Sequence, residues 1–350
     1  MDKIRVGLVG CGGMARSHAT RFSQILDKIE VTGVCDIIKE RAEAVAELLP
    51  NDPVVTEDYK ELFEHVDAAL LVLPHQTHYP ATMDFLNAGK HVLVEKPMAN
   101  SEKECRDMIA CAEENDRVLM VAYCMRFHPL LLKLKELLDS KAYGECFQLS
   151  IWTEQLTRYP EDHWASSAET LGGGQLFSHG CHYIDLMLWY LGQPVRGTHF
   201  GTNFGTPWME REGTSNVTIE FENGAMGYHM GTWGARGTRL RYSFHAHCTE
   251  GMLEVDIRRG LLILHSKEAL HDPSIVKPEE DTAILMEAPS AKPTEEEMAH
   301  FIECINTGCK PRTDAVESLE GLQVIWSLYT AEEEGRLADL TNMGFGSLDL

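Results

Sequence analysis

The chain has 350 residues, a length typical of two domains. Hydrophobic residues make up 44% of it and charged residues 24%, which excludes a disordered or fibrous protein. The 54 acidic and 31 basic residues give a net charge of −23, which repels nucleic-acid phosphates and anionic membrane surfaces. We therefore expect a folded protein with neither nucleic acid nor membrane as a partner.

Targeting signals and cysteine patterns predict the location of the protein and the state of its thiols. No run of 18 uncharged apolar residues predicts a membrane span, and the N-terminus has no cleavage pattern of a signal peptide, so a cytoplasmic location is expected. Ten scattered cysteines without a Cys-x-x-Cys pair predict free thiols. The closest approach to a metal cluster is His179, Cys181 and His182, but no second cluster supplies further ligands, so no metal is predicted.

The first third of the chain alternates short apolar runs with helix-like segments. Strands are expected at 4–10, 30–36, 67–74, 91–97 and 117–123, and helices at 14–26, 39–49, 79–88 and 103–115. Apolar strands that alternate with helices are typical of a parallel sheet covered on both faces. Residues 1–125 are therefore expected to form a doubly wound α/β domain.

From about residue 146 the strands become longer and partly alternate apolar with polar residues. The turn signals Glu222-Asn223-Gly224 and Arg259-Gly260 separate strands that should be antiparallel neighbours. Helices are expected at 174–191 and 294–308. Residues 126–350 should thus form an α+β domain with a large, mostly antiparallel open sheet. The C-terminal segment of this domain could pack back on the first domain.

A glycine motif lies between the first strand and the first helix. Gly10-Cys11-Gly12-Gly13-Met14-Ala15 reads G-x-G-x-x-A, the pattern in which glycines allow a tight turn and a close approach to a pyrophosphate at a helix N-terminus. The second strand ends in Asp36, where a carboxylate would accept ribose hydroxyls. Together they predict a Rossmann dinucleotide site. The alternative is a glycine turn in an α/β protein that binds something else.

The choice between NAD and NADP depends on the residues around Asp36. Its negative charge and the following Ile37 and Ile38 favour NAD over NADP. Lys39 and Arg41 leave NADP open, because either could reach a 2′-phosphate from the next helix.

Several segments in one order resemble the glucose-fructose oxidoreductase, inositol dehydrogenase and MocA family. They are VGLVGCGGMARSHA, LPHQTHYPATMDFLNAGKHVLVEKPMA, YCMRFHP, LGGGQLFSHGCHYIDLMLWYLGQP and FIECINTGCKPRTDAVESLEGLQVIWSLYTAEEEGR. The resemblance implies a Rossmann domain followed by an open-sheet domain, in a homodimer or homotetramer. It also implies nicotinamide-dependent oxidation or reduction of a sugar, polyol or glycoside hydroxyl.

The resemblance places the family lysine at Lys96 and the family histidine at His182. Many members carry an aspartate four residues before that histidine, whereas this chain has Ser178. The residues themselves are compatible with these roles, because Lys96 follows a buried strand at the sheet edge where α/β proteins bind ligands. A lysine there could accept an alcohol proton, with His182 assisting. The structural alternatives are a solvated lysine and a core histidine.

The remaining candidates are assigned by their place along the chain. At the cofactor we expect Gly10, Gly12, Gly13, Met14, Asp36, Arg41, Pro74, His75, His78, Glu95 and Lys96. At the substrate we expect Tyr123, Arg126, Arg158, Tyr159, Trp164, Ser178, His179 and His182. Structural alternatives stay open for several: a helix start for His78, a crossover contact for Arg126, and loop packing for the aromatic residues.

The leading hypothesis is an NAD-dependent dehydrogenase of a secondary hydroxyl in a sugar, polyol or glycoside. A first alternative is oxidation of a glycoside at C3, followed by elimination of the aglycone. A second is a sensor that binds NAD(H) without turnover.

Overall fold

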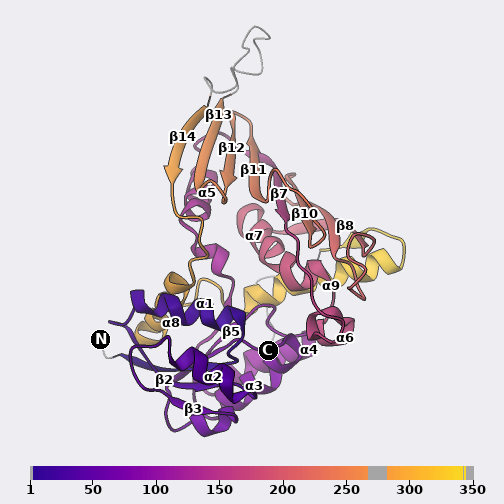
Figure 1. Cartoon of the computed structure of the whole chain (residues 1–350). Coiled ribbons are helices and arrows are strands. Elements are labelled where there is room, and N and C mark those ends of the chain that lie inside the picture. The colour runs from indigo at the N-terminus through magenta and orange to yellow at the C-terminus, as the bar shows by residue number, and fades with distance from the viewer. Residues whose placement is uncertain (1–2, 267–281, 342, 344–350) are drawn as a thin grey trace.

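The computed structural model describes residues 3–266, 282–341 and 343, and two sheets dominate it (Figure 1). The first is a six-stranded parallel sheet in the order β3-β2-β1-β4-β5-β6, so that β1 lies between β2 and β4. Its strands are β1 (Ile4–Val9), β2 (Ile29–Cys35), β3 (Val54–Thr56), β4 (Ala68–Leu71), β5 (His91–Glu95) and β6 (Leu119–Ala122). This confirms the doubly wound sheet; β3 is an edge strand too short for its pattern to have predicted.

Helices cover both faces of this sheet, as the apolar strands require. They are α1 (Gly13–Arg21), α2 (Lys39–Ala46), α3 (His78–Asn87) and α4 (Glu102–Glu114). Ser101 and Glu104 form a capping box that begins α4, and the buried Cys105, Met108 and Ile109 face the core. The later helix α8 (Thr294–Thr307) also packs on this domain, because Met298 and Phe301 belong to the same buried cluster as β1.

The second sheet has nine strands in the order β14-β13-β12-β11-β7-β10-β9-β8-β15. They are β7 (Cys146–Glu154), β8 (Pro194–Thr202), β9 (Thr214–Phe221), β10 (Met226–Thr232), β11 (Tyr242–Cys248), β12 (Gly251–Asp256), β13 (Leu261–Ser266), β14 (Thr282–Glu287) and β15 (Ala338–Asp339). Only β7 and β10 pair in parallel among these. The two turn signals join the antiparallel pairs β9–β10 and β12–β13, as predicted.

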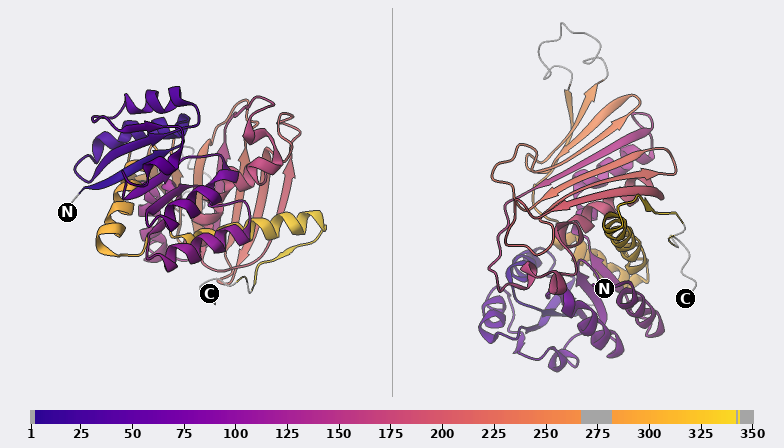
Figure 2. Two further views of the ribbon diagram at one scale, coloured as in Figure 1. Left: turned by 90° about the horizontal axis from the view of Figure 1, so that it is seen from below. Right: turned by 90° about the vertical axis from the view of Figure 1, so that its right-hand side faces the viewer.

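The helices of the second domain lie on the side of this sheet that faces the first domain (Figure 2). They are α5 (Pro129–Asp139), α6 (Ala168–Leu171), α7 (Cys181–Leu191) and α9 (Ala315–Glu333). The opposite face carries half-exposed side chains such as Trp152, Tyr228 and His245. Within the described ranges, no helix is long and apolar enough to cross a membrane.

Candidate active site

The glycine turn after β1 forms the first part of the site. Gly10 has φ +87°, and a Cβ there would lie 2.2 Å from the Val72 carbonyl oxygen, so only glycine fits. At Gly12 and Gly13 a Cβ would meet nothing within 4 Å, which leaves open space at the N-terminus of α1. A pyrophosphate can therefore approach this backbone closely. Met14 lies half-buried in the same first turn of the helix.

Asp36 lies beside this turn, at the end of β2. Its carboxylate accepts hydrogen bonds from the backbone N–H groups of Cys11, at 2.7 Å, and Ile38, at 2.9 Å. These bonds fix an anion next to the open glycine turn, the donor and acceptor set that suits a ribose and a pyrophosphate. Arg41 is exposed on α2, and its charge acts on His163 of the second domain. The residues present thus fit a dinucleotide.

The segment after β4 connects the two domains through His75. Its Nδ1 lies 2.8 Å from the carbonyl oxygen of Leu171, and its ring lies edge-on to Trp164 at 4.8 Å. Burial lowers the pKa of His75 well below its usual range, so the ring is neutral. Pro74, just before it, is half-buried.

His78 has no exposed surface. Its ring nitrogens face the carbonyl oxygens of Pro97, at 2.8 Å, and Leu73, at 2.9 Å. Both contacts are internal, so His78 positions the backbone around β5 and leaves no nitrogen for a cofactor. The expectation of a direct cofactor contact does not match this burial.

Glu95 and Lys96 lie at the carboxyl end of β5. Glu95 is buried, and its Oε1 lies 3.1 Å from Nε2 of His18 on α1. Burial raises the pKa of Glu95, but the hydrogen bond and charge of His18 outweigh it and lower the pKa overall. Lys96 points the other way, and its Nζ donates a hydrogen bond of 2.8 Å to the backbone carbonyl of Ser178. The end of β5 thus directs the Glu95 carboxylate toward α1 and the Lys96 amine toward the second domain.

Ser178 and His179 lie in a π-helical segment, Leu176–Gly180, that precedes α7. The sequence predicted one continuous helix over 174–191. A π-turn holds more residues than an α-turn, so it changes the direction of the side chains before Cys181 relative to those after it. The α-helical spacing that predicted one polar stripe of Ser178, His182 and Asp185 therefore does not apply across this segment.

Glu212 and Tyr329 hold this π-helical segment in place, and no motif in the sequence pointed to either residue. The carboxylate of Glu212 accepts hydrogen bonds from the Leu176 N–H, at 3.1 Å, and from the Tyr329 hydroxyl, at 2.6 Å. Tyr329 in turn accepts from the N–H groups of Gly174 and Phe177. These contacts fix the backbone whose carbonyl holds Lys96.

His182 and His179 are buried beside Lys96. His182 lies edge-on to Tyr123 at 5.5 Å and to His179 at 6.3 Å. Burial first, and then the charges of Lys96 and Lys292, lower the pKa of His182 well below its usual range. Burial also lowers the pKa of His179. Both rings are therefore neutral at neutral pH, and within the described ranges Nδ1 of His182 has no hydrogen-bond partner.

Arg126 makes its hydrogen bonds within the protein. Its guanidinium makes two hydrogen bonds to the Asp185 carboxylate, at 2.8 and 2.7 Å, and a further one to Glu317. It is only 4% exposed. All of its charge is used to hold α7 and α9 to the crossover. These contacts favour the crossover role of Arg126, and its role at the substrate stays a prediction.

The aromatic residues of the loop after β7 pack against one another next to Trp164. Tyr159 stacks on His163 at 4.6 Å and lies edge-on to Trp233 at 5.8 Å. Arg158 is exposed and its guanidinium covers Trp208 at 4.9 Å. Among Arg158, Tyr159 and Trp164, only Trp164 has a described ring contact with His75 of the first domain. Tyr123 is buried behind His182.

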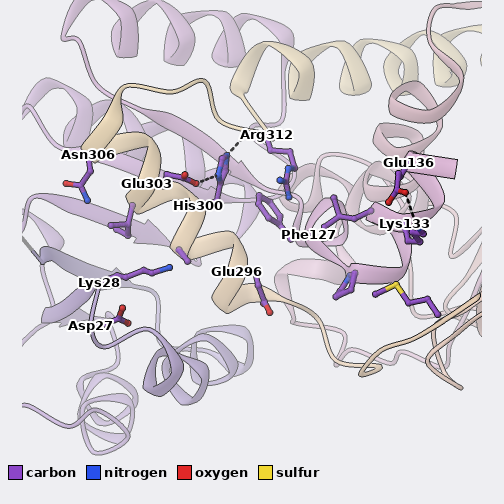
Figure 3. A pocket seen from close by; sticks show the side chains of 15 residues that line it. Asp27, Lys28, Phe127, Lys133, Glu136, Glu296, His300, Glu303, Asn306 and Arg312 are labelled. Atoms are coloured by element: carbon purple, nitrogen blue, oxygen red, sulfur yellow. Dashed lines mark hydrogen bonds and ion pairs between the residues drawn. The ribbon is translucent and has the colours of Figure 1, made fainter. Parts of the chain in front are cut away.

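A separate cavity of about 880 Å³ lies between α5, α8 and β14 (Figure 3). Its charged lining is mixed, with Lys28, Lys133 and Arg312 opposed by four carboxylates. Its lining includes none of the predicted site residues. This cavity is therefore separate from the candidate site that the glycine turn, Asp36 and Lys96 form. This fold and this site define an NAD-dependent oxidoreductase.

Comparisons identify the family. A family model described as an oxidoreductase family with an NAD-binding Rossmann fold matches residues 4–123, and the GFO/IDH/MocA C-terminal domain matches residues 131–254. The chain belongs to the GFO/IDH/MocA oxidoreductase family. Inositol 2-dehydrogenase of Salmonella typhimurium is 25% identical over 252 residues, which cover 67% of this chain and 72% of that protein. D-glucoside 3-dehydrogenase of Escherichia coli is 30% identical over 196 residues, 55% of each chain.

Solved structures share the fold along almost the whole chain. Levoglucosan dehydrogenase in complex with NADH has a TM-score of 0.85 at 18% identity, covering 98% of this chain and 100% of that one. The aldose-aldose oxidoreductase of Caulobacter crescentus, complexed with glycerol, has a TM-score of 0.83 at 23% identity, covering 97% and 100%. At these identities the likeness concerns the fold.

Proposed function

We propose that this protein oxidises or reduces a secondary hydroxyl of a sugar, a polyol or a glycoside. The observation that carries the proposal is Lys96, whose Nζ is held on the Ser178 carbonyl at the sheet edge where the cofactor binds. NAD bound along the glycine turn and Asp36 supplies the hydride acceptor. The names of the inositol and glucoside dehydrogenases among the relatives support this substrate class.

Lys96 handles the proton of the reacting hydroxyl. Its amine, directed toward the second domain by the hydrogen bond to the Ser178 carbonyl, accepts the proton during oxidation and returns it during reduction. His182 is neutral because burial lowers its pKa, and it orients the hydroxyl without adding charge. The buried rings of Tyr123 and His179 keep His182 in this position.

A substrate panel tests the proposal. Purified protein with NAD⁺ and myo-inositol, D-glucose or a methyl glucoside should form NADH, and Lys96→Ala should abolish most of the rate. Mass analysis of the protein as purified checks for a retained cofactor that would hide the signal. Tight NAD(H) binding without turnover of any sugar, polyol or glycoside would instead support a sensor.

His179 supports a second candidate, elimination after oxidation of a glycoside at C3. A C3 ketone acidifies the C2 proton, and His179 is a second neutral base 6.3 Å from His182. NAD⁺-dependent release of nitrophenol from a nitrophenyl glucoside would show this route. Its absence, with NADH formed from the same glycoside, would leave simple dehydrogenation.

We also propose a homodimer or homotetramer formed through the open face of the second sheet. Trp152 lies 4.6 Å from His245 and 6.3 Å from Tyr228 on that face, a group of half-exposed rings suited to an interface. A monomeric mass by light scattering at micromolar concentration would contradict it.

A further inference from the structure

Two cysteines lie side by side at the end of α8, outside the candidate active site. Cys304 is buried in the last turn of the helix, and Cys309 is exposed on the segment that follows it. The thiol of Cys309 donates a hydrogen bond of 3.3 Å to the sulfur of Cys304. All ten cysteines of the chain lie in the described ranges, and Cys309 is the one among them that is exposed. A small oxidant in solution therefore reaches this pair through Cys309.

The backbone between the two cysteines is held in the conformation that brings the sulfurs together. Gly308 ends α8 with φ +70°, and its N–H donates to the Cys304 carbonyl at 2.9 Å. This left-handed residue turns the chain back along the helix. The N–H of Cys309 then donates to Oγ1 of Thr307 at 3.3 Å. Because the sulfurs already touch, a disulfide of about 2 Å needs only a small movement of the exposed Cys309 side chain.

His300 places a basic nitrogen against the buried sulfur. Its Nε2 lies 3.5 Å from Sγ of Cys304, one helical turn further along α8. Figure 3 shows the ring between Glu303, whose carboxylate lies 3.1 Å from Nδ1, and Arg312, whose backbone N–H donates to Nε2 at 3.0 Å. These contacts place the ring proton on Nδ1 and make Nε2 an acceptor, shared between the Arg312 N–H and the Cys304 thiol. The imidazole is therefore positioned to take the thiol proton when this sulfur reacts.

We propose that Cys304 and Cys309 are a modification site, at which a peroxide converts the two thiols into a disulfide that a dithiol reductant reopens. The Cys309 thiolate attacks one peroxide oxygen and becomes a sulfenic acid, while the other oxygen leaves as hydroxide and takes up the proton lost by Cys309. The Cys304 sulfur then attacks the sulfenic sulfur. Its proton passes through His300 to the departing hydroxide, which leaves as water. In total, two thiols and one hydrogen peroxide give one disulfide and two water molecules.

Burial sets the order of these two steps. Burial first, and then the hydrogen bond from Cys309, raise the pKa of Cys304 to about 12, so this sulfur stays a thiol and does not attack peroxide itself. Cys309 is exposed and meets the oxidant first. Neither Lys96 nor the cofactor takes part, so the site is independent of the proposed function.

Thiol mapping by mass spectrometry tests the site on the full-length protein. Reduced protein is treated with a small excess of hydrogen peroxide, denatured and blocked with N-ethylmaleimide, then reduced and labelled with iodoacetamide. We expect the second label on Cys304 and Cys309 together, and its loss when dithiothreitol is added before blocking. In Cys309→Ser, Cys304 should lose nearly all of this label. The matched variant Cys146→Ser, which removes the half-buried thiol of β7, should keep the oxidation of the pair.

His300→Gln tests the second step. Glutamine has no basic nitrogen, so disulfide formation should slow by about tenfold or more, and dimedone should trap more sulfenic acid on Cys309. An unchanged rate would overturn the role of His300. Three results would overturn the site itself: a second label on other cysteines but not on this pair, a bond between two chains through Cys309 on a non-reducing gel, or oxidation of Cys309 to a sulfinic acid with Cys304 still blocked by maleimide.

Discussion

The cofactor end and the substrate end of the candidate site are built differently. At the cofactor end, the Asp36 carboxylate meets the backbone of Cys11, 25 residues away, within one strand-turn-helix unit. At the substrate end, Lys96 meets Ser178 across 82 residues, and His75 meets Leu171 across 96. The first end is a local backbone arrangement, whereas the second exists only when the two domains are packed together. Substitutions at the cofactor end should thus change affinity, and those at the substrate end should change turnover or folding.

Lys96→Ala should produce the largest effect at the substrate end. Loss of a general base lowers kcat by roughly 10²–10⁴. NADH affinity should change little, because the glycine turn and Asp36 stay intact. Steady-state kinetics and NADH titration measure the two quantities separately. A variant that loses NADH affinity as strongly as turnover would show that the two ends are not independent.

Arg126→Gln should destabilise the fold without a specific effect on substrate affinity. Breaking a buried ion pair by removing one partner costs about 3–5 kcal/mol, because the buried Asp185 loses its counter-charge. Denaturant unfolding measures the loss, and KM on the remaining folded protein should stay near its original value. A large rise in KM with unchanged stability would return Arg126 to the substrate.

Acid should weaken the second domain through His229, a buried residue of β10 whose ring stacks on Tyr183 at 5.1 Å. Burial lowers the pKa of His229 to about 3, so the unfolded chain binds a proton below about pH 6.5 that the folded chain does not. Stability is then constant above pH 6.5 and falls by about 1.4 kcal/mol per pH unit below it for this one ring. His229→Gln should flatten the decline of the free energy of unfolding between pH 6.5 and 5. An unchanged slope would place the acid sensitivity elsewhere.

Asp36 should determine cofactor preference with a moderate effect. Asp36→Asn keeps an acceptor for the Cys11 N–H and loses the charge, so the preference for NADH over NADPH should narrow by about tenfold. Asp36→Ala also removes both backbone hydrogen bonds and should weaken both cofactors. Titration of each variant with NADH and NADPH measures this. Tighter binding of NADPH to the unmodified protein would contradict the role of Asp36 and favour Lys39 or Arg41.

The sequence predicted the cofactor end better than the substrate end for a physical reason. The glycine motif and Asp36 report a local backbone conformation, which short patterns encode. The contacts of Glu212 and Tyr329 with the π-helical segment join residues 36 and 155 positions apart in the chain, which no local pattern records. Arg126 shows the converse: its place near the crossover suggested a ligand, whereas in the fold its guanidinium is buried against Asp185.

Ser178→Ala should have the smallest effect, although the family resemblance implies an aspartate at this position. The contact with Lys96 uses the backbone carbonyl of Ser178, which alanine also provides. The hydroxyl contributes at most one neutral hydrogen bond, about 0.5–1.5 kcal/mol, so turnover should fall by less than about tenfold. Kinetics at saturating NAD⁺ measure this against Lys96→Ala in the same assay. A hundredfold loss at Ser178 together with an active Lys96→Ala would mean that the proton passes through this helix, and the role assigned to Lys96 would be wrong.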